Sequence, residues 1–420
     1  MAWERKERRE VLAAGAAHDV LVLEKELERE LEREVVELAQ ELVRCRSVYD
    51  PERGTDERSA ARLVEARMRS FGWSVEVIEV APGRPNVIAT LPAHAAGRTL
   101  AFEGHLDVVT AGDEARWSVS PFSGEIVGDR LYGRGAADMK AGVAAMIYGA
   151  RALELAGPFP GTVKICALVD EEGTMAGAKH AAASGALDGV TGMIVCEPEG
   201  DEICPSSKGA IRLRLEVTGR MSHGAMPELG CSPLPVLSAC VEHLRRAQAR
   251  LQETHGTHPR LGDLYLTPTT LAAGSDRQMN VIPASGSLCI DVRTIPGVDH
   301  RALVDGLASA FSEIARREGA QAALGVIDDR PPVDTPEDDP VVRCLVDAHE
   351  LETGSRPTIG GVPGTTDGTI FTRDLQLPTV VYGPGDKWIA HQADEFVTVG
   401  EIVRYARTYA RAARQFLTER

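Results

Sequence analysis

The alternation of apolar, strand-like runs with helical runs is the feature that most restricts how this chain can fold. The apolar runs expected to form strands are NVIATL, TLAFEGHLDVV, TVKICALVDEE and GMIVCEPE (86–91, 99–109, 162–172 and 192–199). A helical run over residues 138–157 separates the second of these strands from the third and ends at Gly157-Pro158. Apolar strands that alternate with helices are typical of a mostly parallel sheet covered on both faces, so the predicted fold class is α/β.

The pattern changes near residue 208 and returns near residue 329. Residues 210–219, AIRLRLEVTG, alternate apolar and polar side chains, as a half-exposed antiparallel strand does. Two helical runs and two further strand runs follow, which predicts a small α+β domain inserted into the α/β domain. The expected order is a charged helical extension, the first part of the main domain, the inserted domain and the second part of the main domain (1–34, 35–207, 208–328 and 329–420).

Charge and composition exclude several classes of protein. The chain has 420 residues and a net charge of −16, whereas nucleic-acid binding needs a basic face, so no nucleic-acid partner is expected. No stretch approaches about 18 uninterrupted apolar residues, and the charged N-terminus is not followed by the apolar core of a secretory signal, so no membrane span or secretion is expected. Eight cysteines without a CxxC pair fit a reducing compartment, and the expected location is the cytoplasm.

The first 34 residues are dense in Glu and Arg. From Leu23 to Leu42 the apolar residues recur at spacings of three and four, which predicts an amphipathic helix that leads into the main domain. The charged residues are interpreted as its solvated face. The alternative is a partner-binding helix, which would make this chain mainly an assembly protein.

Acidic and histidine residues recur just past the ends of the expected strands. EGHLDVV places His105 and Asp107 there, ALVDEEGT places Glu171 and Glu172, and IVCEPEG places Glu197. Because ligands of open α/β sheets collect beyond the carboxyl ends of the strands, we expect these side chains at one edge of the sheet. Imidazoles and carboxylates gathered at one edge predict a metal site.

The spacing within these motifs suggests which residues bind metal and which act beside it. His105 and Asp107 point to the same side of an extended segment, so Asp107 can accept the second ring N–H of a metal-binding His105. The alternative is an ordinary turn with a capping Asp. Glu171 and Glu172 repel each other unless a cation lies between them. A cation on Glu172 would leave Glu171 as general base for a water whose pKa the metal lowers towards about 7; the alternative is a solvated acidic loop.

Asp138 and His391 each have a structural alternative. Asp138, in GRGAADMKAG, lies at a helix start, where Asp is commonly a cap. His391, in AHQADEF, is a single histidine without a paired ligand nearby in the sequence. Competing chemistries lack their motifs, because GRGAAD misses the third glycine of a dinucleotide fingerprint and the sequence contains no HExxH, GxSxG or GxxxxGK[ST].

Taken together, GHLDVV, GRGAADMKAG, DEEGT, CEPE and HQADEF resemble, in this order and spacing, the M20 metallopeptidases. More narrowly they are similar to the group of acetylornithine deacetylase, succinyl-diaminopimelate desuccinylase and carboxypeptidase G2. The resemblance covers about residues 35–420. It implies an α/β catalytic domain that holds two divalent metal ions, interrupted by an α+β lid domain that also forms a homodimer interface.

The resemblance also implies a role for each motif residue. The implied metal ligands are His105, Asp138, Glu172, Glu197 and His391, with Asp138 shared by both ions. The implied catalytic residues are Asp107, which orients His105, Glu171, which is the base and proton shuttle, and His223, which is supplied across the dimer to the oxyanion. The implied substrate contacts are Asn280, Arg293, Gly361 and Gly385, and the planar fork of Arg293 suits a carboxylate. Zinc is the expected metal, with cobalt or manganese as alternatives.

The reaction implied by the resemblance is hydrolysis of the amide bond of a small N-acyl amino acid. A dipeptidase or carboxypeptidase of the same family is one alternative, because the motifs do not separate an acyl cap from a free α-amine. A non-catalytic metal-binding homologue is the other, although the base position and all five ligand positions are intact.

Overall fold

The computed structural model describes residues 25–91 and 94–419, which form two compact units. The second unit consists of Ser206–Asp334 and Gly361–Thr365, and the first unit contains the rest of the described chain. The region expected as an inserted domain, 208–328, lies within the second unit. The short segment at 361–365 also belongs to the second unit and had no counterpart in the sequence analysis.

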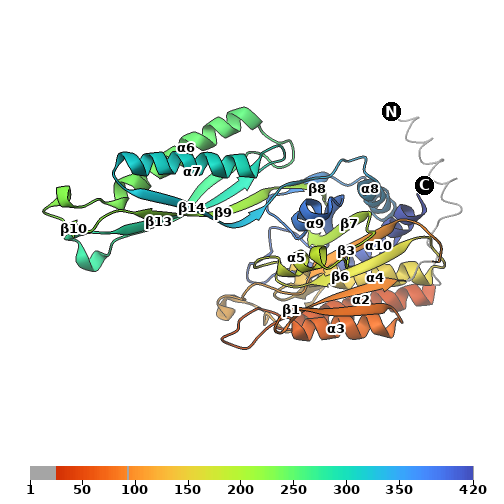
Figure 1. The fold of residues 1–420 in the computed structure, drawn as a ribbon. Helices are drawn as coiled ribbons and strands as arrows, with labels where there is room; N and C mark the ends of the chain where they lie inside the picture. The colour runs from red at the N-terminus through yellow and green to blue at the C-terminus, as the bar shows by residue number, and fades with distance from the viewer. Residues whose placement is uncertain (1–24, 92–93, 420) are drawn as a thin grey trace. The chain divides into compact units, whose positions relative to one another are not determined.

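A mixed sheet forms the centre of the first unit (Figure 1). Its strands follow the order β1 (Ser74–Ala81), β2 (Arg84–Leu91), β6 (Thr162–Leu168), β3 (Thr99–His105), β7 (Gly192–Pro198), β17 (Thr379–Gly383) and β8 (Ile203–Ser207), and β8 also pairs with β16 (Ile359–Val362). The four strands β6, β3, β7 and β17 are mutually parallel, whereas β1, β2 and β8 pair antiparallel. The predicted α/β class is confirmed, and the sheet is parallel at its centre and antiparallel towards its edges.

Helices cover both faces of this sheet (Figure 1). One face carries α2 (Lys25–Arg44), α3 (Arg58–Ser70), α4 (Ala141–Leu155), α8 (Pro340–Thr353) and α10 (Val399–Thr418), and the other carries α5 (Ala176–Ala183) and α9 (Gly368–Leu375). Helix α4 packs against the sheet, α2 and α10, which explains why its sequence is apolar on nearly every side. Helix α10 begins with a capping box between Thr398 and Glu401, a feature that stabilises a helix start by about 1 kcal/mol.

The amphipathic helix predicted from the leucine spacing is present as α2. It runs without interruption through residue 34 to Arg44 and buries Leu31, Val35, Leu38 and Leu42. Residues 1–24 of the expected N-terminal extension lie outside the described residues. Among the helices that the structure describes, none combines the length and apolar character needed to cross a membrane.

The second unit contains a four-stranded antiparallel sheet in the order β11 (Tyr265–Ala273), β13 (Ser285–Thr294), β9 (Gly209–Thr218) and β14 (Gln321–Arg330). Helices α6 (Pro233–His255) and α7 (His300–Arg317) cover one face, and every second residue of β9 from Ile211 is buried beneath them. The sequence predicted three of these strands and both helices. It missed β11, an exposed edge strand whose Pro268 weakens the strand pattern and is tolerated at an edge.

Candidate metal centre

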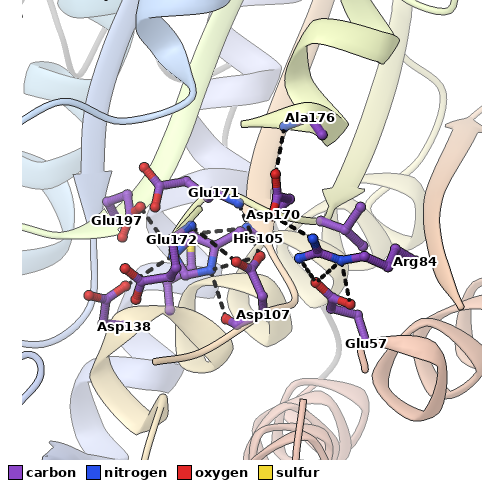
Figure 2. A network of polar contacts seen from close by, with 12 residues as sticks. Glu57, Arg84, His105, Asp107, Asp138, Asp170, Glu171, Glu172, Ala176 and Glu197 are labelled. Atoms are coloured by element: carbon purple, nitrogen blue, oxygen red, sulfur yellow. Dashed lines mark hydrogen bonds and ion pairs between the residues drawn. The ribbon is translucent and has the colours of Figure 1, made fainter. Parts of the chain in front are cut away.

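Four parallel strands of the first unit deliver metal-capable side chains to one end of the sheet. His105 is the last residue of β3, Glu197 lies near the end of β7, and Glu171 and Glu172 follow the end of β6. His391 comes from the segment that follows β17. Because β6, β3, β7 and β17 are parallel neighbours, their carboxyl ends meet at the same edge, and Figure 2 shows His105, Glu171, Glu172 and Glu197 gathered there.

Asp138 completes the cluster from a short segment before α4. Its backbone is not helical (φ −115°, ψ 92°), and α4 itself begins three residues later at Ala141. The N-cap residue of α4 is Lys140, so Asp138 does not occupy the cap position that was the structural alternative for it. Its Oδ1 lies 3.1 Å from Nε2 of His105, and its Oδ2 lies 3.2 Å from Nε2 of His391.

Each histidine also faces a glutamate of its own. Nε2 of His105 lies 3.3 Å from Oε1 of Glu197, and Nε2 of His391 lies 2.9 Å from Oε1 of Glu172. The cluster thus consists of two histidine–glutamate pairs, with one oxygen of Asp138 directed at each. All five residues that the sequence singled out as ligands are brought together.

Burial and mutual contacts shift the protonation of this cluster. Burial opposes the charge on His105, but Glu197 and Asp138 outweigh it and hold the pKa of its ring well above the ordinary value. Hydrogen bonds to Asp138 and Glu172 raise the pKa of His391 to about 10. Burial and the nearby Asp138 raise the pKa of Glu197 to about 8. The buried carboxylates therefore favour the protonated, positively charged form of both histidines.

The donor set fits divalent metal ions. Donor atoms of His105, Asp138 and Glu172 lie within 4.8 Å of one another, as do those of His105, Glu171 and Glu197. Imidazole nitrogens and carboxylate oxygens are the ligands that zinc, cobalt and manganese accept. A cation that replaces the two ring protons would neutralise the same carboxylates, so the residues present suit the metals that the resemblance implies.

Asp107 contacts His105 through its main-chain carbonyl, and Glu171 and Glu172 through its carboxylate. Nδ1 of His105 lies 2.9 Å from the Asp107 carbonyl oxygen but 3.8 Å from the carboxylate, which was the partner expected from the sequence. The carboxylate instead accepts the N–H groups of Glu171 and Glu172, at 3.2 and 3.0 Å. The carbonyl leaves Nε2 of His105 directed at Asp138 and Glu197, as a metal ligand requires.

Glu171 lies at the edge of the donor cluster and is 9% exposed. Burial raises the pKa of its carboxyl well above the ordinary value, and the carboxylates of Glu197 and Glu172 add to this effect. Its main-chain N–H is fixed by Asp107. A carboxyl group in this position has the chemistry of a general base beside the donor cluster.

The remaining predicted residues are dispersed. His223 (in β10, Ser222–His223) and Asn280 lie close together and exposed in the second unit, where Gly224 N–H donates to the Asn280 carbonyl and β10 pairs with β12 (Val281–Ile282). Arg293 lies on β13 and its fork is engaged by Asp291, with bonds of 2.7 and 3.2 Å. Gly361 lies on β16 against Leu261 and Arg260.

Gly385 lies in the first unit and has a positive φ of 97°. A Cβ at this position would come within 2.8 Å of Ala137. This tight turn explains the glycine without a substrate, so its predicted role in substrate binding gains no support from the geometry.

A buried ion-pair network beside the Glu171–Glu172 segment could not be predicted from the sequence (Figure 2). Arg84, at the start of β2, donates from Nε to Glu57 at 2.9 and 3.0 Å and from its guanidinium to Asp170 at 2.5 Å. Asp170, whose φ of 69° turns the chain, also accepts the N–H groups of Thr174 and Ala176. The network therefore fixes the loop that carries both glutamates. The DEE run offered a signal for Asp170, but nothing in the sequence linked it to Arg84.

Replacing Arg84 by Met is expected to lower the free energy of unfolding by about 3–5 kcal/mol, because Glu57 and Asp170 would remain buried without a counter-charge. Urea unfolding measures this loss. The matched control is Arg33→Met, which removes an arginine that is 65% exposed and should cost less than about 1 kcal/mol. Equal losses in the two variants would show that the Arg84 network does not stabilise the fold.

Comparison with known proteins shows sequence relatives and shared folds. The sequence profile of peptidase family M20/M25/M40 matches residues 101–415. A succinyl-diaminopimelate desuccinylase of Rhodospirillum centenum is 31% identical over 89% of this chain and 95% of its own length. A Staphylococcus aureus protein named "Probable succinyl-diaminopimelate desuccinylase" is 27% identical over 82% of this chain and 89% of its own length.

Solved structures show the same fold at lower sequence identity. The crystal structure of aminopeptidase PepT from Bacillus cereus superposes with a TM-score of 0.72 and 20% identity, over 93% of this chain and 98% of that one. At this level of identity the likeness concerns the fold.

Proposed function

This chain belongs to the M20/M25/M40 peptidase family of metal-dependent amide hydrolases, and we propose that it removes the acyl group from an N-acyl amino acid. N-succinyl-diaminopimelate is the first substrate to consider, because both desuccinylases described above are named for it. Short peptides are the alternative, supported by the shared fold of the aminopeptidase. The proposed products are a carboxylate and an amine.

One observation carries the proposal most directly. The two oxygens of Asp138 are directed at two different histidines, and each histidine has a glutamate of its own. This is the donor arrangement that two cations sharing one carboxylate require. His105, Glu197 and Asp138 would hold one ion, and Glu172, His391 and Asp138 the other, with zinc as the first choice and cobalt or manganese as alternatives.

The metal ions, when bound, polarise the substrate carbonyl and lower the pKa of water. Glu171 takes the proton from the attacking water and passes it to the leaving nitrogen, so one carboxyl group serves as base and then as acid. Asp107 keeps Glu171 in place by accepting its main-chain N–H, and its carbonyl orients His105. These roles use only residues that lie together in the first unit.

The second unit would supply further contacts. We assign His223 to the developing oxyanion, across a homodimer, and Asn280 and Arg293 to the substrate. Binding a substrate carboxylate would require Arg293 to exchange its pairing with Asp291. The edge strand β14 carries two adjacent exposed apolar side chains, Val326 at 49% and Ile327 at 67%, and an apolar strand edge of this kind supports a protein interface there. A monomeric mass in light scattering at micromolar concentration would count against the dimer.

A substrate panel tests the proposed function. After reconstitution with Zn²⁺, Co²⁺ or Mn²⁺, hydrolysis should be fastest for N-succinyl-diaminopimelate or N-acetylornithine and slow for dipeptides with a free α-amine. The reverse order would identify a peptidase. If no amide is hydrolysed with any of the three metals, the chain is a non-catalytic homologue.

The cytoplasm is the proposed location. The structure shows all eight cysteines as free thiols, with Cys166 and Cys196 buried, and this pattern supports a reducing compartment. Cell fractionation with an antibody to the chain tests the assignment.

A further inference from the structure

Glu395 is a buried acid that none of the roles above uses. Its side chain is completely enclosed, with an exposed fraction of 0%. One carboxylate oxygen accepts the main-chain N–H groups of Ala137 and Asp138, at 2.9 and 3.0 Å. The other accepts the N–H of Gly135 at 3.1 Å and the guanidinium of Arg134. Four donors from one short segment thus converge on a single carboxylate.

The position of Glu395 links two parts of the metal centre that are far apart in sequence. It lies four residues after His391, and the segment that it binds carries Asp138. The two segments are also joined by their backbones, because the N–H of Gly133 donates to the Glu395 carbonyl at 2.9 Å. Just beyond, strand β18 (Phe396–Thr398) pairs with β5 (Arg130–Tyr132). The Glu395 carboxylate is therefore a buried polar connection between the segments of His391 and Asp138.

A second anchor lies on the other side of His391. Nζ of Lys387, four residues before it, lies 2.7 Å from Oε2 of Glu199 and 2.8 Å from Oε2 of Glu202. Glu199 is 3% exposed and follows Glu197 by two residues. Lys387 thus ties the His391 segment to the end of β7.

His391 is much more exposed than the other histidine of the cluster. Its side chain is 51% exposed, whereas that of His105 is 1% exposed. Its backbone has a φ of 65°, a conformation that a non-glycine residue adopts only at a cost, so the surrounding chain must impose it. The anchors at Lys387 and Glu395 are the charged contacts that flank it.

We propose that Glu395 and Lys387 are positioning residues, which hold His391 and Asp138 in the relative positions that metal binding needs. The inference rests on the proposed function, because it assumes that these two side chains are ligands. Neither anchor is one of the five proposed ligands. Glu395 contributes most, because it fixes the carboxylate shared by both ions. Partners of this kind typically change metal affinity by about 10–100-fold when they are removed.

The test measures metal affinity in metal-free protein rather than activity. Zn²⁺ is titrated against a chromophoric chelator for the wild type, E395Q and K387M. E395Q keeps the size of the side chain but turns an amide N–H₂ towards backbone donors, so we expect its affinity for at least one ion to fall about 10–100-fold. K387M should weaken binding less, because Asp138 keeps its anchor.

The matched control is Glu352→Gln, which removes the charge from a glutamate–arginine pair with Arg411, between α8 and α10 and outside the site. It should leave zinc affinity within about threefold of the wild type even if it lowers the unfolding free energy. Wild-type affinity in both E395Q and K387M would overturn the inference. If the wild type itself binds no zinc, the proposed function fails together with the inference. Zinc binding by the wild type with no loss in the variants overturns the inference alone. Should E395Q not fold, K387M alone decides, and unchanged affinity there is a negative result.

Discussion

Replacing Glu171 by Gln is expected to lower kcat/KM by about 10²–10⁴-fold while the protein keeps its full metal content. The amide cannot take a proton from water, but it has nearly the same size and leaves the five ligand side chains unchanged. Steady-state kinetics on the best substrate of the panel gives the first quantity. Metal analysis of the purified variant gives the second.

The neighbouring substitution Glu172→Gln provides the control. Glu172 lies 2.9 Å from Nε2 of His391, so its loss should reduce metal content as well as activity. The two adjacent variants would then separate the base from the ligand. Loss of metal from Glu171→Gln would instead identify Glu171 as a ligand, a role that its distance to His105 and Glu197 would also permit.

Removing the metal ions with a chelator is expected to destabilise the protein by about 4 kcal/mol, relative to a solution in which free metal exceeds its dissociation constant roughly 1,000-fold. The physical reason is the concentration of acidic groups around the site, because Asp138, Glu171 and Glu197 are buried or nearly so. Without cations, only protonation of these groups and of the two histidines offsets their repulsion.

Thermal unfolding measures this effect. The melting temperature should rise by roughly 5–7 °C when metal is returned to the chelated protein, and the rise should grow with metal concentration. The variant Glu172→Gln should show a smaller rise. A melting temperature that is independent of metal would mean that the folded chain does not bind metal more tightly than the unfolded chain does.

The sequence was most informative about the strands and the ligands that follow them. Strands β3, β6 and β7 are mostly apolar because both faces of the sheet are covered, so the residues at which they begin could be predicted. Their carboxyl ends then had to meet, which placed His105, Glu172 and Glu197 together. Asp138 and His391 lie outside regular strands, and only the family resemblance could join them to the set.

Contacts between distant segments could not be predicted in the same way. The pairing of Arg84 with Glu57 and Asp170 depends on three segments whose relative placement is set by packing. Asp170 lies in the DEE run, but nothing in the sequence links it to Arg84 or Glu57. The same holds for Asp107, whose carboxylate could equally have reached the His105 ring. The turn at Asp170 directs two main-chain N–H groups at the Asp107 carboxylate, which therefore binds them and not the His105 ring.

The short pairing of β8 with β15 (Val333–Asp334) has a consequence for how the metal centre assembles. Ser206 pairs with Asp334 and Ser207 with Val333, so the chain entering the second unit is hydrogen-bonded to the chain leaving it. Roughly 190 residues separate Glu197 from His391 in sequence, but about two thirds of them lie beyond this junction. Once the second unit has folded, the loop that must close to unite these two ligands is only about a third as long. The entropic cost of closing that loop is then roughly 1 kcal/mol smaller. Folding of the inserted unit therefore makes it easier to bring together the ligands on either side of it.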